Sequence, residues 1–181
     1  MTARLIHLNG PPGVGKSTLA ARWTAEHPGT LNCDIDVLRT LVGGWREDFS
    51  GTGELIRPVA LAMISAYLAG GHDVVMPQLI ARAQEQERFE HAALSVGARL
   101  VLVFVDAPDE SLRVRWRRRT GQDPWTAASV AVVEAHGGDE VVDRFAGQIR
   151  ERARARPEAP VLMAPEGEID ATYDALVRLL G

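Results

Sequence analysis

Cysteine, lysine and long apolar runs are scarce in this chain of 181 residues. The single cysteine, Cys33, excludes a disulfide scaffold and a four-cysteine zinc site, and it suits a reducing compartment. The longest apolar stretch, from Pro58 to Ala69, is shorter than the roughly 20 residues that a membrane helix needs. No signal peptide is visible at the N-terminus. These absences favour a soluble cytoplasmic protein without a membrane partner.

The composition is that of one globular domain, which we expect to span residues 1–181. Hydrophobic residues make up 46% and charged residues 24% of the chain, and the net charge is −4. This charge gives no general attraction to nucleic acid, so nucleic acid is a disfavoured partner. Of the 20 basic residues, Lys16 is the only lysine. Lysine presents a compact charge on a thin stem, which the guanidinium of arginine does not.

Short apolar runs alternate with longer helical patterns, which is typical of strands joined by helical crossovers in a parallel sheet. The run from Leu100 to Val105 suits a strand that is buried on both faces. Strands are predicted at 4–8, 30–33, 73–76, 100–105 and 160–163. Helices are predicted at 16–27, 54–69, 82–96 and 169–180. The expected fold is therefore three-layer α/β with a five-stranded parallel sheet.

Two segments depart from this alternation. Residues 42–53 contain four glycines, and residues 120–138 are interrupted by Gly121, Pro124 and the Gly137–Gly138 pair. Long irregular segments in a compact domain are often substrate loops or lids. The alternative for each is a surface insertion that the fold merely tolerates.

A complete phosphate-loop motif, G-x-x-x-x-G-K-[ST], follows the first predicted strand and precedes a predicted helix. Its glycines allow backbone N–H groups to surround a phosphate, and the helix adds the positive end of its dipole. Lys16 is expected to reach the β- and γ-phosphates, and the Ser17 hydroxyl to hold Mg²⁺. The predicted ATP-binding residues here are Gly10, Pro11, Pro12, Gly13, Val14, Gly15, Lys16, Ser17 and Thr18.

Asp34 and Asp36 follow the second predicted strand, at the edge where ligands bind in open α/β sheets. In an extended segment, side chains two residues apart point the same way, so both carboxylates can face one site. One would hold metal-bound water and the other would accept a hydroxyl proton. The alternative is that Asp36 caps a helix that begins at Val37.

The phosphate loop together with Asp34-x-Asp36-x-x-Arg39 resembles the small P-loop kinases. This group includes shikimate and gluconate kinases, zeta toxins, polynucleotide kinases, and tunicamycin-resistance and chloramphenicol-phosphotransferase proteins. The resemblance implies a P-loop fold like that of nucleoside monophosphate kinases, with a lid, and ATP and Mg²⁺ as cofactors. It also implies that Asp34 helps to hold Mg²⁺, that Asp36 is the base or contacts the acceptor hydroxyl, and that Arg39 positions the acceptor.

The likeness continues into residues 109–121, which resemble the helix before the lid of these kinases. There arginines close over the transferring phosphate, which implies this role for Arg115 and Arg119, with Arg118 in reserve. The alternatives are a nucleic-acid patch or an exposed basic turn. Pro165 and Gly167 match the loop that contacts adenine in the family. Arg150, Arg152, Arg154 and Arg156 are interpreted as a solvated helix end.

The same likeness places an acceptor-binding segment at about 37–70, including Trp45 and Arg46, and a lid at about 113–138. Many relatives carry an acidic residue at the end of the third strand, where this chain reads Pro77-Gln78. Tunicamycin-resistance proteins look similar here, which favours that branch and a role in antibiotic resistance. Asp106 follows the fourth strand, where the aspartate of such kinases is usually structural, so Asp34 is preferred for the metal.

The sequence thus predicts an ATP-dependent phosphotransferase that acts on a hydroxyl of a small molecule, either a metabolite or an antibiotic. Two alternatives stay open. One is an ATP-binding switch or drug-sequestering protein with little transferase activity, and the other is a polynucleotide 5′-kinase. The sequence determines neither the acceptor nor the oligomeric state.

Overall fold

The computed structural model describes residues 2–119 and 124–181 as alternating strands and helices. The strands are β1 (Arg4–Asn9), β2 (Leu31–Asn32), β3 (Val74–Met76), β4 (Arg99–Asp106) and β5 (Val161–Met163). The helices are α1 (Lys16–Glu26), α2 (Ile35–Arg39), α3 (Gly51–Ala69), α4 (Ala83–Leu94), α5 (Asp109–Arg117), α6 (Pro124–Ala135), α7 (Asp139–Arg154) and α8 (Ile169–Leu180).

The five strands form one parallel sheet in the order β2-β3-β1-β4-β5. β1 lies at its centre and pairs with β4 from Arg4 opposite Arg99 to Asn9 opposite Phe104. The strand that follows β1 in the chain lies beyond β3, whereas β4 and β5 lie on the other side. Ligands in open α/β sheets bind outside the carboxyl ends of the strands where the strand order changes direction. The segment that begins at Gly10, directly after β1, lies at this position.

The sheet is buried on both faces because its central strands carry apolar side chains in consecutive positions. In β1, Leu5, Ile6 and Leu8 are fully buried. Ile6 and Leu8 pack in one core with Leu19 of α1 and other side chains of α5, α7 and α8. Leu5 packs in a second core with side chains of α3 and α4. A third cluster joins Leu102 and Phe104 of β4 to Ile149 of α7. Apolar side chains thus cover both faces of the sheet, which explains why the central strands show no polar alternation.

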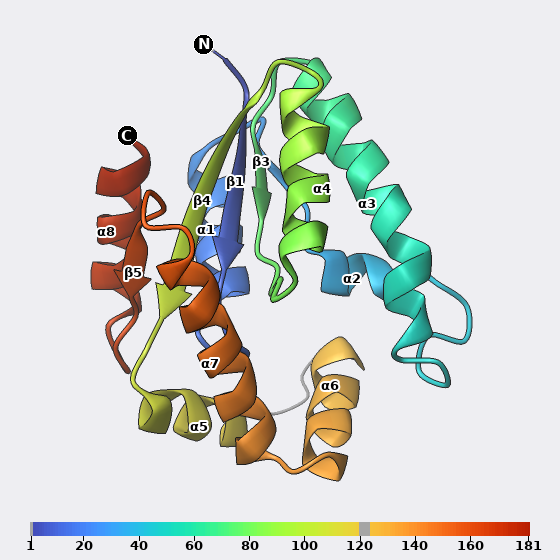
Figure 1. Ribbon diagram of the computed structural model, residues 1–181, viewed down its shortest axis with the longest axis vertical. Helices are drawn as coiled ribbons and strands as arrows, with labels where there is room; N and C mark the ends of the chain where they lie inside the picture. The colour runs from blue at the N-terminus through green and yellow to red at the C-terminus, as the bar shows by residue number, and fades with distance from the viewer. Residues whose placement is uncertain (1, 120–123) are drawn as a thin grey trace.

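Figure 1 shows the resulting three layers, with α1 behind the sheet and α4 and α7 in front of it. The helices α2 and α6 lie beyond the carboxyl ends of the strands, on either side of the space below β1 and β3. This arrangement leaves the sheet as a rigid support and places the less regular segments around its carboxyl edge.

The predicted five-stranded α/β fold is confirmed, and its strands and four helices occupy the expected segments. The expectation that 120–138 is irregular is wrong for its described part, because 124–135 form α6. Pro124 is the first residue of this helix, a position that proline favours, and Gly137 and Gly138 follow its end in left-handed conformations. The residues that suggested an interruption therefore bound a helix. Gly121 lies outside the described residues.

The prediction of a solvated helix end at 150–156 also needs correction. Arg150 of α7 pairs with Asp106 and Asp109, and Arg156 pairs with Glu90 and Glu158. These ion pairs join α7 to β4, α5 and α4, so two of the four arginines hold elements together. Separately, no helix within 2–119 or 124–181 is long and apolar enough to cross a membrane.

Candidate active site

The phosphate loop connects β1 to α1 and has the backbone conformation that its glycines permit. Gly13 and Gly15 have φ values of 78° and 102°, in the left-handed region that other residues rarely adopt. Gly10 has a different constraint, since a Cβ there would lie 2.4 Å from the carbonyl oxygen of Val105 in β4. A side chain at position 10 would force the loop away from the sheet. Glycine is therefore needed at 10 for space and at 13 and 15 for conformation.

The side chain of Lys16 bonds back to the start of this loop. Its Nζ donates hydrogen bonds to the carbonyl oxygens of Gly10, at 2.8 Å, and Pro11, at 2.9 Å. Desolvation, together with the nearby Arg119 charge, lowers the pKa of Lys16 to about 8, although the Asp36 and Asp34 charges partly offset this fall. The ammonium group is thus a poorly hydrated cation held at the centre of the loop, ready to exchange carbonyl oxygens for phosphate oxygens.

Asn9, the last residue of β1, is a structural residue of the site that the sequence analysis missed. It is fully buried, its Nδ2 donates to the carbonyl oxygen of Ile80, and its Oδ1 accepts from the Ile80 N–H. This pair of bonds fixes the segment after β3 against the start of the phosphate loop. A polar residue that ends an apolar strand directly before Gly10 was the available signal.

Asp34 links the phosphate loop to α2. Its Oδ2 accepts a hydrogen bond from Ser17 Oγ at 2.9 Å, and its Oδ1 accepts from the backbone N–H of Asp36 at 3.1 Å. Asp34 is therefore the N-cap of α2, and the alternative that Asp36 is the cap is wrong. The adjacent hydroxyl and carboxylate oxygens are hard ligands of the kind that Mg²⁺ prefers, so this pair fits the predicted metal position.

Asp36 lies in the first turn of α2, so the expected extended backbone at 34–36 is also wrong. Desolvation and the neighbouring Asp34 charge raise the pKa of Asp36 to about 6, although Arg39, Lys16 and Arg119 partly offset this rise. The side chain still exposes 35% of its surface, which moderates the shift. The charges of Lys16 and Arg119 thus both act on Asp36, and its side chain remains partly exposed.

Asp106, the other candidate for the metal, is occupied by protein groups. Arg150 donates to both of its carboxylate oxygens, at 2.8 and 3.2 Å, and the Ala107 N–H donates to Oδ1 at 2.8 Å. Arg150 also pairs with Asp109. This arrangement gives Asp106 a bridging position between β4 and α7, whereas Asp34 is bonded directly to Ser17.

Arg39 is held among aromatic rings on the acceptor side of the site. Its guanidinium carbon lies 4.3 Å from the ring centre of Trp125 and 4.7 Å from that of Phe49, and it donates to the Phe49 carbonyl oxygen. Its Nη1 is 3.8 Å from an oxygen of Asp36. Cation–π contacts of this kind fix the direction of a guanidinium. The aromatic rings therefore orient Arg39 toward the second aspartate.

The same rings join α6 to residues 45–49. Trp125 of α6 stacks on Phe49 with ring centres 4.6 Å apart and planes 14° apart, and it lies 5.8 Å from Trp45. Trp45 is buried, whereas Arg46 is exposed with its guanidinium carbon 4.6 Å from the Trp45 ring. Trp125 and Phe49 were not predicted as site residues, because their contact joins positions that are 76 residues apart in the sequence.

Replacing Trp125 by alanine should detach α6 from the acceptor-binding segment. Removing a buried tryptophan costs about 3 kcal/mol of local stability, so amide hydrogen exchange in α6 and in 45–49 should accelerate on the order of a hundredfold. Exchange in β1 and β4 should stay unchanged and serves as the internal reference. Trp125→Phe should keep most of the protection, and equal exchange in all three proteins would show that the stack does not hold the lid.

Most arginines between Arg113 and Arg119 already have partners within the protein. Arg113 pairs with Asp143 and Arg117 with Asp139, both on α7, while Arg118 pairs with Glu166. Arg115 donates to the carbonyl oxygens of Val14, at 3.3 Å, and Ala164, at 2.7 Å. Four of the five arginines in this segment are therefore bonded to other parts of the protein.

Arg119 differs from the other four arginines of this group. Its guanidinium carbon lies 5.5 Å from the centre of the Trp116 ring, and its charge lowers the pKa of both Lys16 and Asp36. Arg115 instead connects the phosphate loop to the segment after β5, where Pro165 and Gly167 lie. Gly167 has a φ of 78°, which glycine permits at low cost. The two predicted lid arginines thus occupy different positions in this structure.

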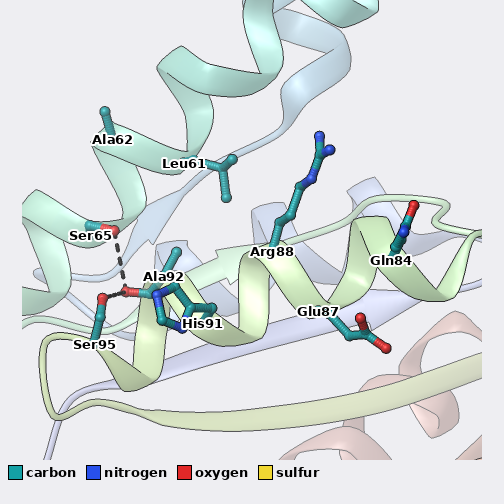
Figure 2. Close-up of a pocket in the computed structure, with 9 residues that line it drawn as sticks. All are labelled: Leu61, Ala62, Ser65, Gln84, Glu87, Arg88, His91, Ala92 and Ser95. Carbon is teal, nitrogen blue, oxygen red and sulfur yellow. Dashed lines mark hydrogen bonds between the residues drawn. The ribbon is translucent and has the colours of Figure 1, made fainter.

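A groove of about 660 Å³ lies away from these residues, between α3 and α4 (Figure 2). The hydroxyls of Ser65 and Ser95 both donate to the Ala92 carbonyl oxygen, as the dashed lines show. His91 and Arg88 point from α4 into the same region. None of the phosphate-loop or aspartate residues lines this groove, so we place the candidate active site at the carboxyl edge of the sheet instead.

The comparisons with known proteins agree with this fold. A candidate kinase from Chloroflexus aurantiacus is 18% identical, with a TM-score of 0.69, over 99% of this chain and 96% of that one. Shikimate kinase from Bacteroides thetaiotaomicron is 19% identical, with a TM-score of 0.62, over 98% of both chains. A chain of the Pnkp1/Rnl/Hen1 RNA repair complex is also 19% identical, with a TM-score of 0.62, over 85% of this chain and 46% of that one.

At these identities the solved structures show a shared fold, the P-loop fold of shikimate kinase. No curated protein matches the chain. The family model AAA_33, described as an AAA domain, matches residues 5–138, which include the phosphate loop and both aspartates. This chain therefore belongs to the AAA_33 family of AAA domains, and that membership implies nucleotide binding.

Proposed function

We propose that the protein is a small-molecule kinase that transfers the γ-phosphate of ATP to a hydroxyl group. The observation that carries this proposal is the hydrogen-bonded series from Ser17 through Asp34 to the backbone of Asp36. It ties a phosphate-binding residue to a carboxylate that is positioned to act on an acceptor. A carboxylate of raised pKa beside a phosphate loop is typical of a group that takes up a proton during a reaction.

Ser17 and Asp34 would hold Mg²⁺ in this site, and the phosphate loop would hold the nucleotide phosphates. When bound, Mg²⁺ neutralises charge on the phosphate oxygens of ATP. Lys16 adds a positive charge from the loop, and Arg119 adds one from the lid. Arg115 would keep the phosphate loop and the predicted adenine loop at Pro165 and Gly167 in register, because it donates to a carbonyl oxygen of each segment.

Asp36 acts as the base in the proposed reaction. The acceptor oxygen forms a bond to the γ-phosphorus while the bond from that phosphorus to the leaving oxygen of ADP breaks. The hydroxyl proton passes to a carboxylate oxygen of Asp36. Arg39 lies beside Asp36 and would contact the acceptor, while Trp45 and Arg46 would line the rest of the acceptor pocket. Trp125 of the lid helix would complete it.

The proposal is tested by measuring ATP consumption with Mg²⁺ against a broad panel of hydroxylated metabolites and antibiotics. Mass spectrometry of each acceptor identifies any product that gains one phosphate. An acceptor that gains a phosphate supports the kinase and names its substrate. Tight ATP binding with slow hydrolysis and no modified acceptor across the panel would contradict the proposal and favour a nucleotide-binding switch.

The pH dependence of kcat/KM should be bell-shaped, with limbs set by Asp36 and Lys16. Asp36 must be deprotonated to accept a proton, so activity should rise with pH through about 6. Lys16 must be protonated to attract phosphate, so activity should fall as pH rises through about 8. The measurement is kcat/KM at saturating acceptor, with ATP varied, across this range of pH.

Arg119→Gln tests the assignment of both limbs. The Arg119 charge lowers the pKa of Asp36 and of Lys16, so its removal should move both limbs to higher pH. ATP also titrates near the acid limb, but the same ATP is used with both proteins, and a difference between them therefore comes from the protein. If both limbs of the pH profile stay at the same pH in Arg119→Gln, Asp36 and Lys16 are not the groups that cause them.

A further inference from the structure

A second concave site lies on the front of the molecule, between α7 and the start of α4. This pocket of about 620 Å³ is lined mainly by Arg82 at the N-cap of α4 and by Arg144, Phe145, Gln148, Glu151 and Arg152 of α7. Figure 1 shows both helices on the same face of the sheet. The proposed kinase function assigns no role to any of these residues.

The charge of this pocket is unusual for this protein. Arg82, Arg144 and Arg152 form no ion pair among the described residues, whereas Arg150 and Arg156 of the same region are each paired twice. Glu151 is the only carboxylate in the lining. Three guanidinium groups around one carboxylate leave a local excess of positive charge in a chain whose net charge is −4. Such an excess favours binding of an anion.

Buried hydrogen-bond donors without acceptors beside the pocket also favour binding of an anion. The Nε of Arg152 and the Nε2 of Gln86 are buried, and neither has a hydrogen-bond acceptor within the described part of the chain. Gln86 itself is only 1% exposed, and its Oε1 accepts a long bond of 3.5 Å from Arg152. Buried donors without acceptors are costly, so an acceptor oxygen that enters here would be stabilised. No side chain caps the N-terminus of α4, so backbone N–H groups of its first turn, next to Arg82, are further donors.

We propose that Arg82, Arg144 and Arg152 bind an oxyanion, a carboxylate or phosphate group, in the pocket between α4 and α7. Guanidinium groups bind both with paired, charge-assisted hydrogen bonds. Arg152 supplies the buried donor, Arg144 and Arg82 supply charge from opposite sides of the pocket, and Gln148 supplies a neutral amide. The group belongs either to the phosphate acceptor or to a separate anionic ligand.

This site is distinct from the phosphate loop. Ala81, which also lines the pocket, follows Ile80, and both backbone groups of Ile80 are already bound to Asn9. None of the residues that line the pocket belongs to the phosphate loop. Oxyanion binding here does not depend on phosphate transfer, so it would hold even if the proposed function were wrong.

The test is a nuclear magnetic resonance titration of the whole chain with inorganic phosphate, at an ionic strength held constant with sodium chloride. The Nε–H signal of Arg152 and the side-chain amide signal of Gln86, assigned by substitution, report on the pocket. The backbone signals of Gly13 and Gly15 report separately on the phosphate loop. Phosphate should shift the pocket signals saturably, and Arg144→Gln should weaken that binding about tenfold.

Arg154→Gln is the matched control, because Arg154 lies on α7 but does not line the pocket. It should leave phosphate binding in the pocket unchanged. Pocket signals that stay fixed while those of Gly13 and Gly15 move would overturn the proposal. Equal affinity in the wild type and Arg144→Gln would overturn it as well, since Arg144 would then contribute nothing.

A second measurement, on the acceptor panel, distinguishes an oxyanion that belongs to the phosphate acceptor from one that belongs to a separate ligand. This measurement rests on the proposed function. If the acceptor carries the group, Arg144→Gln should raise KM about tenfold for anionic acceptors only. If the group belongs to a separate ligand, the KM values of anionic and neutral acceptors should stay alike in the variant.

Discussion

Asp36→Asn is expected to lower the rate of phosphate transfer by about 10²–10⁴-fold, the usual contribution of a positioned base. The amide has nearly the same shape as the carboxylate, but it cannot take the proton of the acceptor hydroxyl. Nucleotide affinity should change little, because the phosphate loop and Lys16 keep their bonds. Folding should also persist, since a carboxyl whose pKa is raised in the folded protein opposes folding when it ionises.

The measurement is single-turnover transfer at saturating ATP and acceptor, together with equilibrium binding of ATP. Asp174→Asn is the matched control, since Asp174 is exposed on α8 and forms no ion pair within residues 2–119 and 124–181. It should transfer phosphate at the wild-type rate. Equal rates in Asp36→Asn and Asp174→Asn would remove Asp36 from the mechanism, and a large loss of ATP affinity would assign it to nucleotide binding instead.

The fold was predictable because the patterns that specify it are local. A continuous apolar run such as Leu100 to Val105 has few alternatives to a buried strand, and the glycines of the phosphate loop match the positive φ values at Gly13 and Gly15. The family match over 5–138 follows the same residues. The antibiotic-resistance branch stays a prediction, because it depends on the short stretch after the third strand and on no spatial contact.

The two aspartates lie close together, as predicted, but in a different local structure from the one expected. The sequence analysis placed Asp34 and Asp36 on one side of an extended segment, but Asp34 is a helix cap and Asp36 begins the helix. The carboxylates still gather at one site, because the cap bond from the Asp36 N–H holds Asp34 beside it. Spacing of two residues fits both arrangements, so spacing alone could not distinguish them.

The aromatic contacts could not be predicted for a different reason. The stack of Phe49 on Trp125, with Arg39 against both rings, joins three segments that have no periodic relation in the sequence. Arg39 was predicted from the resemblance to small P-loop kinases and Trp45 from its position after Asp36. Trp125 was missed because residues 120–138 were expected to be irregular. Long-range side-chain contacts depend on the packing of α6, which appears only in the folded protein.

Lys16→Met is expected to lower phosphate transfer by about 10²–10³-fold, the usual cost of losing one group that stabilises charge in the transition state. Unlike Asp36→Asn, it should also weaken ATP binding, because Lys16 is the cation inside the loop. Methionine fills similar space but cannot donate to the Gly10 and Pro11 carbonyl oxygens or attract phosphate. Equilibrium binding of ATP and single-turnover transfer measure the two effects separately.

Lys16→Arg then distinguishes charge from shape. It keeps a positive charge, but a planar guanidinium is wider than an ammonium group and must fit where Nζ now lies 2.8 and 2.9 Å from two carbonyl oxygens. We expect it to lose at least about tenfold in transfer, whereas Arg154→Met, an exposed cation removed from α7, should lose nothing. Wild-type transfer by Lys16→Arg would contradict the steric argument. A loss in Lys16→Arg would explain why a chain that otherwise uses only arginine keeps its one lysine here.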